Sequence, residues 1–302
     1  MKLLALGGLH RWFDLPLISS NTFPLVRNYR PLGKTGLRMS DISMGTGEPP
    51  PVSLVLRAID RGINYIDTAP DYGRAEEVVG EALRKRKDRQ IIVATKFCLP
   101  GPYPNHLPKD AKKKDYIRAL EGSLRRLKRD WVDIVFVHAI GEQSRNIEEE
   151  RQRLLSEEML SAVETLKRQG KVRLLGVSSH GPYNMEDLMM EAVRSGHYDM
   201  IMVAFNFMKF PELPEVIKEA HKRGMAVVAM KTLAGAKQVK IPRSDEPFAL
   251  AALRWVLKHS ELSGLVITIR SVSQLNLYLR ASGTGFGPSD EAVLRKYEKV
   301  LS

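Results

Sequence analysis

The feature that most constrains the fold of this chain is a repeated unit of a short apolar run followed by an amphipathic segment. The runs are rich in β-branched residues and nearly continuous, which is typical of strands buried on both faces. Their alternation with helical segments indicates parallel strands joined by right-handed crossovers. Candidate strands lie at 41–45, 63–67, 91–96, 132–138, 172–178, 200–206, 225–231 and 265–270. Eight such units in about 250 residues predict an α/β fold, the closed (β/α)8 TIM barrel.

The segments between the apolar runs have the periodicity of helices that bury one face. Residues 75–83, 116–127 and 148–168 each place their apolar side chains along one stripe, and we expect 148–168 to be one long helix. The last segment, 289–301, is expected to be a C-terminal helix that caps one end of the fold. The alternative, an open doubly wound sheet, needs a glycine-rich phosphate turn, but no G-x-G-x-x-G motif occurs in the sequence.

No stretch of the sequence reads as a linker long enough to divide the chain. We therefore expect an N-terminal extension of unknown role at 1–28 and a single TIM-barrel domain at 29–302. The extension begins like a signal peptide, but polar residues interrupt its apolar part, so we favour a cytoplasmic protein and keep export as the alternative. No run of about 18 apolar residues exists, and we expect no membrane span.

The cysteine count and the charge balance restrict the chemistry and the partners. The one cysteine, Cys98, rules out an intramolecular disulfide and suits a reducing cytoplasm, and we expect no cysteine metal site and no metal ligands. The net charge of +12 favours anionic ligands, including phosphorylated cofactors. Basic clusters at 84–87, 112–114 and 125–129 are typical of solvated helix ends and loops, with nucleic-acid or membrane-surface contact as the alternative.

Four reactive side chains lie at or just after the ends of consecutive candidate strands. Asp67, Lys96 and His138 each end a strand, and Tyr72 follows Asp67 by five residues. If the strands are parallel neighbours, their carboxyl ends share one rim, which is where α/β enzymes place their chemistry. Each residue alone has a plain structural interpretation. Asp67 could cap a helix and Lys96 could lie on the surface, whereas Tyr72 could form a wall and His138 could be a core histidine. All four together at one rim predict an active site.

An acid, a phenol, an ammonium and an imidazole together predict proton transfer to a polar oxygen. A phenol has an ordinary pKa near 10 and donates its proton reluctantly at neutral pH. A nearby ammonium lowers that pKa, a carboxylate keeps the ammonium charged, and a histidine opposite donates a hydrogen bond to a substrate oxygen. Such a site protonates an oxygen on which negative charge develops, as when hydride reaches a carbonyl carbon. General acid catalysis of this kind accelerates a reaction roughly 10² to 10⁴-fold.

Several stretches of the chain resemble the aldo-keto reductase family. Residues 29–40, YRPLGKTGLRMS, resemble the opening of many bacterial members, and residues 62–73, GINYIDTAPDYG, match the long first signature of the family. Shorter motifs at 94–96, 137–138 and 176–180 resemble the later ones. The resemblance covers about residues 29–282. It implies a TIM barrel, a nicotinamide cofactor bound in an extended form, and reversible carbonyl reduction.

The resemblance also implies a role for each residue that matches a family motif. Tyr72 would be the proton donor, with Lys96 as the partner that lowers its pKa. Asp67 would be the counter-ion of the lysine, and His138 would orient the substrate carbonyl.

Residues expected at the nicotinamide end of the cofactor match the family only in part. Ser178 would hold the carboxamide, and Ser179 stands where many members have asparagine, as a shorter donor. Met202 replaces a usual glutamine, and Met230 replaces a tyrosine that stacks on the ring in many members. A thioether can pack against a ring face, and plain core residues are the equal alternative for both methionines.

Residues expected at the phosphate end favour NADPH over NADH. Arg270 and Ser271 resemble the segment that grips the adenosine 2′-phosphate, and an arginine fork suits a phosphate well. A solvated strand end is the alternative for Arg270. Asn276 falls where another arginine is common, and Lys231 is expected to assist with the pyrophosphate.

The substrate is not defined by any pattern in the sequence. Loops 97–115 and 141–147 are expected to form the pocket walls, with Phe97, Tyr103, Trp131 and Phe207 as apolar contributors. We expect Trp131 rather to pack at the start of the fourth strand, and Cys98 to be a buried or loop thiol. One branch of the family carries a C-terminal ferredoxin-like tail, but no cysteine cluster is present, and we expect no iron–sulfur centre.

These observations favour an NADPH-dependent aldehyde or ketone reductase acting on a small carbonyl substrate. The alternative is a cofactor-sensing regulatory subunit with little turnover, because potassium-channel β subunits share this barrel. An RNA-binding protein needs a basic stripe interleaved with aromatic residues, which the sequence does not show. The oligomeric state stays open.

Overall fold

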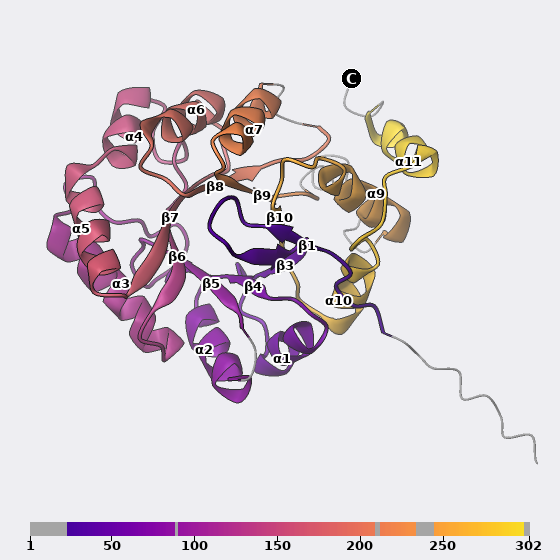
Figure 1. The fold of residues 1–302 in the computed structure, drawn as a ribbon, viewed down its shortest axis with the longest axis horizontal. Helices are drawn as coiled ribbons and strands as arrows, with labels where there is room; N and C mark the ends of the chain where they lie inside the picture. The colour runs from indigo at the N-terminus through magenta and orange to yellow at the C-terminus, as the bar shows by residue number, and fades with distance from the viewer. Residues whose placement is uncertain (1–22, 88–89, 209–211, 234–244, 299–302) are drawn as a thin grey trace, which may run out of the picture.

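The computed structural model describes residues 23–87, 90–208, 212–233 and 245–298. Within these residues eight parallel strands close into a barrel with helices around it (Figure 1). The closed barrel confirms the predicted (β/α)8 fold. The order around the barrel is β10-β3-β4-β5-β6-β7-β8-β9, and β9 pairs with β10 to close it. The strands are β3 (Ile42–Gly45), β4 (Tyr65–Asp67), β5 (Ile92–Lys96), β6 (Val132–Val137), β7 (Val172–Ser179), β8 (Met200–Ala204), β9 (Ala226–Met230) and β10 (Gly264–Thr268).

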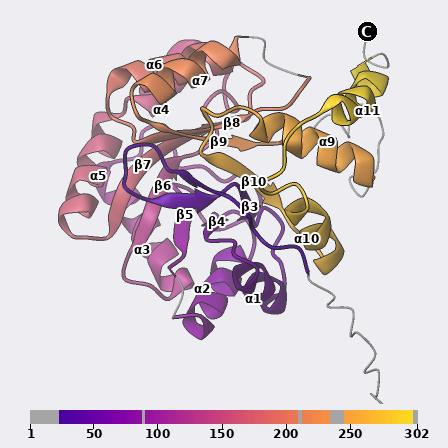
Figure 2. The same cartoon turned by 45° about the vertical axis from the view of Figure 1, so that its right-hand side comes forward.

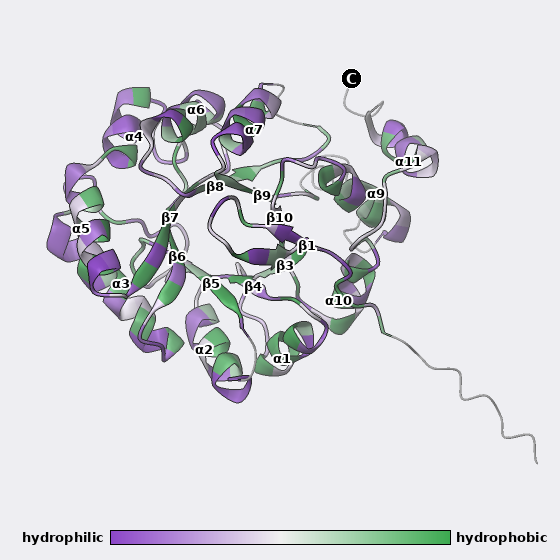
Figure 3. Cartoon of the chain, in the orientation of Figure 1, coloured by the Kyte–Doolittle hydropathy of each residue, from purple (hydrophilic) through white to green (hydrophobic). Residues whose placement is uncertain are grey.

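Helices follow the strands and cover the outside of the barrel. In Figure 3 they carry both hydrophobic and hydrophilic residues, as helices with one buried face do. Their bounds are α1 (Val52–Asp60), α2 (Ala75–Lys85), α3 (Lys113–Leu127), α4 (Ile147–Leu154), α5 (Glu157–Arg168), α6 (Met185–Ser195), α7 (Leu213–Lys222), α9 (Glu246–Leu257), α10 (Val272–Leu279) and α11 (Pro288–Glu298). None of the described helices is long and apolar enough to cross a membrane.

Two of the expected helices differ from the structure. The single helix expected over 148–168 is wrong, because α4 ends at Leu154 and α5 starts anew after Ser156. The Ser156 hydroxyl accepts a hydrogen bond from the Met159 amide at 3.3 Å, which is the geometry of a helix N-cap. The C-terminal helix, α11, does not cap an end of the barrel; it packs against α9 in the outer ring (Figures 1 and 2). There the Tyr297 and Phe248 rings lie 5.1 Å apart.

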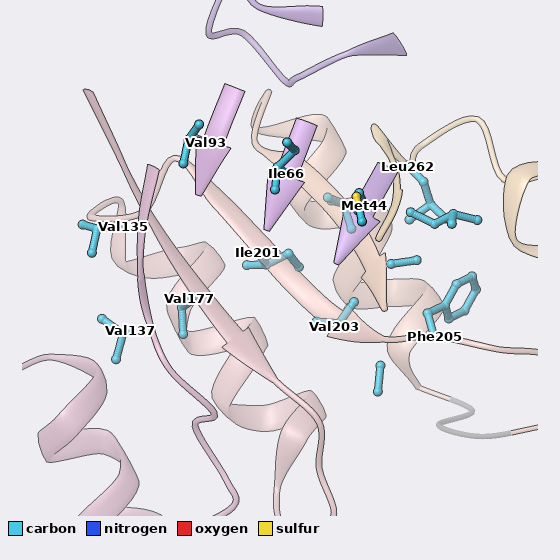
Figure 4. Close-up of a cluster of buried hydrophobic side chains, with 14 of the residues drawn as sticks. Met44, Ile66, Val93, Val135, Val137, Val177, Ile201, Val203, Phe205 and Leu262 are labelled. Atoms are coloured by element: carbon cyan, nitrogen blue, oxygen red, sulfur yellow. The ribbon is translucent and has the colours of Figure 1, made fainter. Parts of the chain in front are cut away.

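Alternate residues of each strand face opposite sides of the barrel wall. On β6, Ile134 and Phe136 belong to the cluster inside the barrel, whereas Val135 and Val137 belong to the cluster between strands and helices. Figure 4 shows part of the outer cluster, with Val135 and Val137 beside residues of β5, β7 and β8. Because side chains alternate along a strand, His138, two residues past Phe136, continues the inward-facing series at the carboxyl end.

A hairpin closes the amino-terminal end of the barrel. Strands β1 (Tyr29–Pro31) and β2 (Arg38–Ser40) pair antiparallel, and the hairpin crosses the middle of the barrel in Figure 1. Its Leu32 and Met39 are fully buried in the interior cluster. The turn needs glycine at Gly33, which has φ +54°, and a Cβ there would lie 2.6 Å from the Ala226 nitrogen. This end of the barrel is therefore packed shut, and the opposite end is open to a ligand.

The expected division into an extension and one domain stays a prediction. Residues 1–22 lie outside the described part of the chain. Within the remainder of the expected extension, the Val26 amide donates to the Arg61 carbonyl at 2.9 Å and the Arg27 amide to the Ser282 hydroxyl at 2.8 Å. Residues 23–28 are thus attached to the barrel by backbone hydrogen bonds.

Candidate active site

A buried ion pair forms the floor of the candidate site. Lys96 ends β5 and Asp67 ends the neighbouring strand β4, both on the inward-facing side. The Lys96 ammonium donates to both carboxylate oxygens of Asp67 at 2.7 Å and to the Thr68 carbonyl at 3.0 Å. Burial raises the pKa of the Asp67 carboxyl, and Lys96 opposes that rise. The three hydrogen bonds use every proton of the ammonium, so the lysine is fixed in place.

Tyr72 and His138 lie beside this ion pair. The loop after β4 turns back with a hydrogen bond from the Tyr72 amide to the Ala69 carbonyl at 3.2 Å. This turn places the Tyr72 hydroxyl 3.5 Å from Nε2 of His138 and the Tyr72 ring centroid 5.1 Å from the Lys96 ammonium. The structure therefore brings together all four residues that the sequence predicts as an active site.

The ionisation of these groups departs from one expectation. From the sequence, Lys96 is expected to lower the pKa of Tyr72, but burial raises that pKa well above its usual value, and Asp67 and Asp71 raise it further. The physical reason is that burial disfavours the charged phenolate, and the negative charges of the two carboxylates add to this effect. Burial and the Lys96 charge lower the pKa of His138 well below its usual value. At neutral pH the phenol carries its proton and the imidazole is neutral.

Backbone contacts hold His138 at the end of β6. The Arg153 guanidinium donates to the His138 carbonyl at 2.9 Å and is paired with the fully buried Glu150 at 2.7 Å. Ala139, the next residue, has φ +54°, a conformation that costs energy for a residue with a side chain. Its amide donates to the Ser178 hydroxyl at 3.0 Å. Arg153 and Glu150 read as ordinary charged helix residues in the sequence, so no signal there could have identified them.

Behind His138 lies a second polar cluster that the sequence analysis did not identify. The Cys98 sulfur lies 3.0 Å from Nδ1 of His138 and 3.7 Å from Nδ1 of His106. A carboxylate oxygen of Asp71 lies 3.8 Å from the same His138 nitrogen. Cys98 is buried, as expected. The motif DTAPDYG could have drawn attention to Asp71, but nothing in the sequence links it to Cys98 and His106.

A cavity of about 600 Å³ opens above the ion pair at the carboxyl end of the barrel. It has the size of typical sites for small ligands and cofactors. Charged, hydroxyl-bearing and apolar side chains all contribute to its lining. Its lining residues are Gly45, Gly47, Glu48, Asp67, Tyr72, Tyr103, His180, Met202, Met230, Lys231, Thr232, Leu233, Val266, Ile267, Thr268, Arg270 and Tyr278.

Four of the predicted cofactor residues line this cavity. Met202 and Met230 line the cavity and also belong to the interior cluster of the barrel, and their role in cofactor binding stays a prediction. Lys231 and Arg270 lie at its exposed side. The Arg270 guanidinium makes a two-pronged ion pair with Glu48, an acidic partner that the sequence analysis did not consider.

The other four predicted cofactor residues have different contacts and do not line the cavity as the described residues define it. The Ser178 hydroxyl accepts from the Ala139 amide, and the Ser179 hydroxyl donates to the Ile140 carbonyl at 2.7 Å. Ser271 is the N-cap of α10, where its hydroxyl accepts from the Gln274 amide at 3.2 Å. The Asn276 side chain accepts a hydrogen bond from Arg61.

Of the four aromatic residues expected to line the substrate pocket, Tyr103 alone is among the described residues that line the cavity. Tyr103 lines the cavity, whereas Phe97 is buried against the Tyr116 ring and Phe207 packs beside Phe248. Trp131 lies at the start of β6, between Arg129 and Arg173, as expected for its packing role. The sequence analysis missed His180, which is paired with Glu142, and Thr232, whose buried hydroxyl has no hydrogen-bond partner among the described residues.

Comparison with known proteins agrees with the observed fold. Residues 48–245 match the model of the aldo/keto reductase family. The chain is 27% identical to the uncharacterized oxidoreductase YrpG of Bacillus subtilis over 90% of this chain and 95% of that protein. It is 38% identical, over 36% of this chain and 37% of the other, to a protein of Oryza sativa named as a probable voltage-gated potassium channel subunit beta.

A solved structure has the same arrangement of elements. The crystal structure of a Pseudomonas aeruginosa protein classed as an aldo-keto reductase matches with a TM-score of 0.69 and 26% identity, over 86% of this chain and 97% of the other. The fold and the matched sequence define an oxidoreductase of the TIM-barrel type. Since the family model covers more than half of the chain, this protein belongs to the aldo/keto reductase family, and it is an enzyme of that family.

Proposed function

We propose that this protein reduces an aldehyde or a ketone to an alcohol with NADPH, and that Tyr72 donates the proton. The observation that carries the proposal is the geometry at the floor of the cavity. A protonated phenol lies there beside a buried Lys96–Asp67 pair and 3.5 Å from Nε2 of a neutral His138. A proton donor, a fixed positive charge and a hydrogen-bonding imidazole are what a carbonyl oxygen needs as it becomes an alcohol.

The cavity fits a nicotinamide dinucleotide. Its apolar part, which includes Met202, Met230 and Val266, suits a flat ring. The Thr232 hydroxyl has no hydrogen-bond partner among the described residues, and it would suit a polar group of the ligand. Arg270 lies at its exposed side, where phosphate groups would be held. The cofactor, when bound, supplies the hydride.

The residues of the chain would then control the proton and the orientation of the substrate. The substrate oxygen would lie between the Tyr72 hydroxyl and Nε2 of His138, because these are the two polar atoms that face each other above the ion pair. Nε2 would donate a hydrogen bond to that oxygen and orient the carbonyl. As negative charge grows on the oxygen, Tyr72 would release its proton. The Lys96 charge would stabilise the phenolate that remains.

The preference for NADPH depends on Arg270 and its partner Glu48. A 2′-phosphate would have to displace the Glu48 carboxylate from the guanidinium, because both ligands use the same fork of donors. The pair is exposed, with 39% and 59% of the two side chains accessible, so this exchange costs little. We therefore keep NADPH as the favoured cofactor, with NADH possible.

The experiment is a titration of the purified protein with NADPH and separately with NADH, followed by tryptophan fluorescence. We expect NADPH to bind more tightly, and Arg270→Ala to remove that preference without weakening NADH. A carbonyl panel then measures the oxidation of NADPH by wild-type protein. Binding of neither nucleotide would contradict the cofactor assignment, and binding without turnover on any carbonyl would contradict the reductase assignment.

A second candidate is a cofactor-sensing regulatory subunit. The match to the Oryza sativa channel subunit supports it, over about a third of the chain. This candidate predicts retained nucleotide, very slow turnover with every carbonyl, and a protein partner recovered by pull-down. The complete set of Asp67, Tyr72, Lys96 and His138 favours the reductase, because a sensor needs no proton donor.

A further inference from the structure

We propose that Asp71, Cys98, His106 and His138 form a binding site for one divalent transition-metal ion, with Zn²⁺ as the best match. This proposal goes beyond the reductase activity and departs from the sequence-based expectation that the chain has no metal ligands. The four residues offer one sulfur, two imidazole nitrogens and one carboxylate oxygen, and these four atoms all lie within 4.8 Å of one another.

The spacing of these atoms is close to that of tetrahedral coordination. Metal–ligand bonds of about 2.0–2.3 Å at tetrahedral angles put ligand atoms roughly 3.3–3.8 Å apart. Here the Cys98 sulfur lies 3.0 Å from Nδ1 of His138 and 3.7 Å from Nδ1 of His106. The Asp71 carboxylate lies 3.8 Å from Nδ1 of His138. Small side-chain shifts would bring all four atoms onto one ion.

The donor types select the metal. Calcium and magnesium take oxygen ligands, so a site with sulfur and two nitrogens does not suit them. Sulfur, imidazole and carboxylate together are ligands that Zn²⁺ accepts in tetrahedral sites. A thiolate and a carboxylate would also cancel the two charges of the ion, which matters because three of the four residues are buried. On binding, the thiol proton of Cys98 would pass to solvent.

Two of the proposed ligand residues each have a buried polar atom without a hydrogen-bond partner among the described residues. Asp71 is 2% exposed, and its oxygen Oδ1 has no hydrogen-bond partner among the described residues; the same holds for Nε2 of His106. Buried polar atoms are nearly always paired in folded proteins. The other oxygen, Oδ2, lies 3.8 Å from Nδ1 of His138 and accepts a hydrogen bond from the Asn105 amide at 3.2 Å. A cation at the cluster would therefore be a further partner for a carboxylate that the described residues satisfy only in part.

The loop after β5 holds two of the proposed ligands close together by its own backbone contacts. Cys98 and His106 face each other across an isolated antiparallel bridge, and the Leu99 amide donates to the Asn105 carbonyl at 2.8 Å. The Asn105 amide also donates to the Asp71 carboxylate at 3.2 Å, which ties this loop to the loop after β4. His106 is the partly exposed ligand, so an ion would enter from its side.

An ion at this site would also fix the orientation of the histidine in the candidate active site. Nδ1 of His138 faces the cluster, whereas Nε2 faces the Tyr72 hydroxyl. With Nδ1 bound to a metal, the one ring proton of His138 must lie on Nε2, the nitrogen that would donate to a substrate oxygen. This consequence rests on the proposed function; the metal site itself does not.

The test measures metal binding without substrate or nucleotide, so its failure is separate from a failure of the reductase assignment. Full-length protein prepared without a polyhistidine tag is stripped with a chelator and dialysed against micromolar Zn²⁺, and bound metal is counted by mass spectrometry. We expect one ion per chain. Substituting Co²⁺ should produce the intense visible absorption of a tetrahedral site and a near-ultraviolet band from a thiolate ligand. The Co²⁺ spectrum of the unmodified chain needs no variant to fold.

Two variants and a matched control identify the ligands. Cys98→Ser should abolish the thiolate band, and Cys98→Ser and His106→Gln should each weaken Zn²⁺ binding by at least about tenfold. His197→Gln, which changes an exposed histidine outside the cluster, should bind like the unmodified protein. Circular dichroism confirms that each variant is folded. Absence of bound Zn²⁺, or binding that is unchanged in Cys98→Ser and shows no thiolate band, would overturn the proposal.

Discussion

The two ends of the barrel are built in opposite ways. At the amino-terminal end, the hairpin β1–β2 inserts Leu32 and Met39 into the interior, where both are fully buried among apolar residues. At the carboxyl end, the same interior finishes in a buried Lys96–Asp67 pair and a cavity of about 600 Å³. The first end contributes apolar burial. The second end buries charge, which costs energy unless each charge is paired.

Because of this difference, we expect the stability of the fold and the activity of the site to depend on opposite ends of the barrel. Residues at the packed end should affect unfolding and leave the reaction alone, whereas residues at the open end should affect the reaction first. The separation is incomplete at Lys96 and Asp67, because a buried ion pair that loses one member is left with an unpaired charge. Variants at the two ends test whether stability and activity are separate in this way.

The largest expected effect is on turnover, at Tyr72. Tyr72→Phe removes the proposed proton donor, and we expect kcat to fall by roughly 10² to 10⁴. Stability should change by less than about 1 kcal/mol, because the hydroxyl makes a long contact of 3.5 Å with His138. Steady-state kinetics and equilibrium urea unfolding measure the two effects. Tyr183→Phe, outside the cavity, serves as the control, and full activity of Tyr72→Phe would remove Tyr72 from the mechanism.

The next largest effect is expected at the ion pair, on both properties. Lys96→Met should abolish turnover and destabilise the fold by about 3–5 kcal/mol, because Asp67 would stay buried without its cation. Without Lys96 the pKa of Asp67 rises further, so the folded state holds the proton more tightly than the unfolded state. The stability loss should therefore be small below pH 4, near the ordinary pKa of aspartate, and grow as pH rises.

The double variant Asp67→Asn/Lys96→Met is the matched control for this loss. It should recover much of the stability and show no such pH dependence, because neither residue then titrates. A loss in Lys96→Met that is the same at every pH would mean that the charge on Asp67 is not its cause. Urea unfolding at several pH values distinguishes these outcomes.

At the packed end the expected effect is on stability alone. Leu32→Ala leaves a cavity in the interior and should cost about 2–5 kcal/mol. The kcat should be unchanged, because Leu32 lies at the opposite end from the cavity that holds Tyr72. Leu25→Ala, which truncates a side chain that is 51% exposed, should shift stability by no more than about 0.5 kcal/mol. A large loss of kcat in Leu32→Ala would show that the two ends are coupled.

The smallest expected effect is at the hairpin turn. Gly33→Ala forces a side chain into φ +54° and places its Cβ 2.6 Å from the Ala226 nitrogen. We expect a loss of about 1–3 kcal/mol. Gly36→Ala shares the positive φ, at +79°, but meets nothing within 4 Å, so it isolates the conformational cost from the contact. Thermal unfolding of both variants gives the difference, and equal losses would contradict the close approach at Gly33.

The strand pattern in the sequence predicts most of the barrel and the core of the site. Each of the eight expected strands overlaps an observed one, with ends that differ by at most two residues. Since side chains alternate along a strand, the positions of Asp67, Lys96 and His138 relative to their apolar runs already place them inside the barrel. Parallel order then brings them to one rim. The boundary between α4 and α5 was missed, because the stripe of apolar residues continues across Ser156.

Contacts between distant loops could not be predicted, because periodicity and motifs are local patterns and do not show which loop lies beside which. The pairing of Arg270 with Glu48 joins residues 222 positions apart, and it changes how a phosphate would reach that arginine. Ser178 turned out to hold the backbone of Ala139 instead of lining the cavity. The cluster of Asp71, Cys98, His106 and His138 likewise draws on three separate loops and strand ends.

The sequence by itself thus determined the barrel and the inward direction of the residues on its strands, because period and polarity along a strand are local properties. The closing hairpin, the partner of Arg270 and the cluster of Asp71, Cys98 and His106 beside His138 became apparent only in the folded structure. These depend on the packing of segments far apart in the chain, where a shift of a few ångströms decides whether two polar atoms meet.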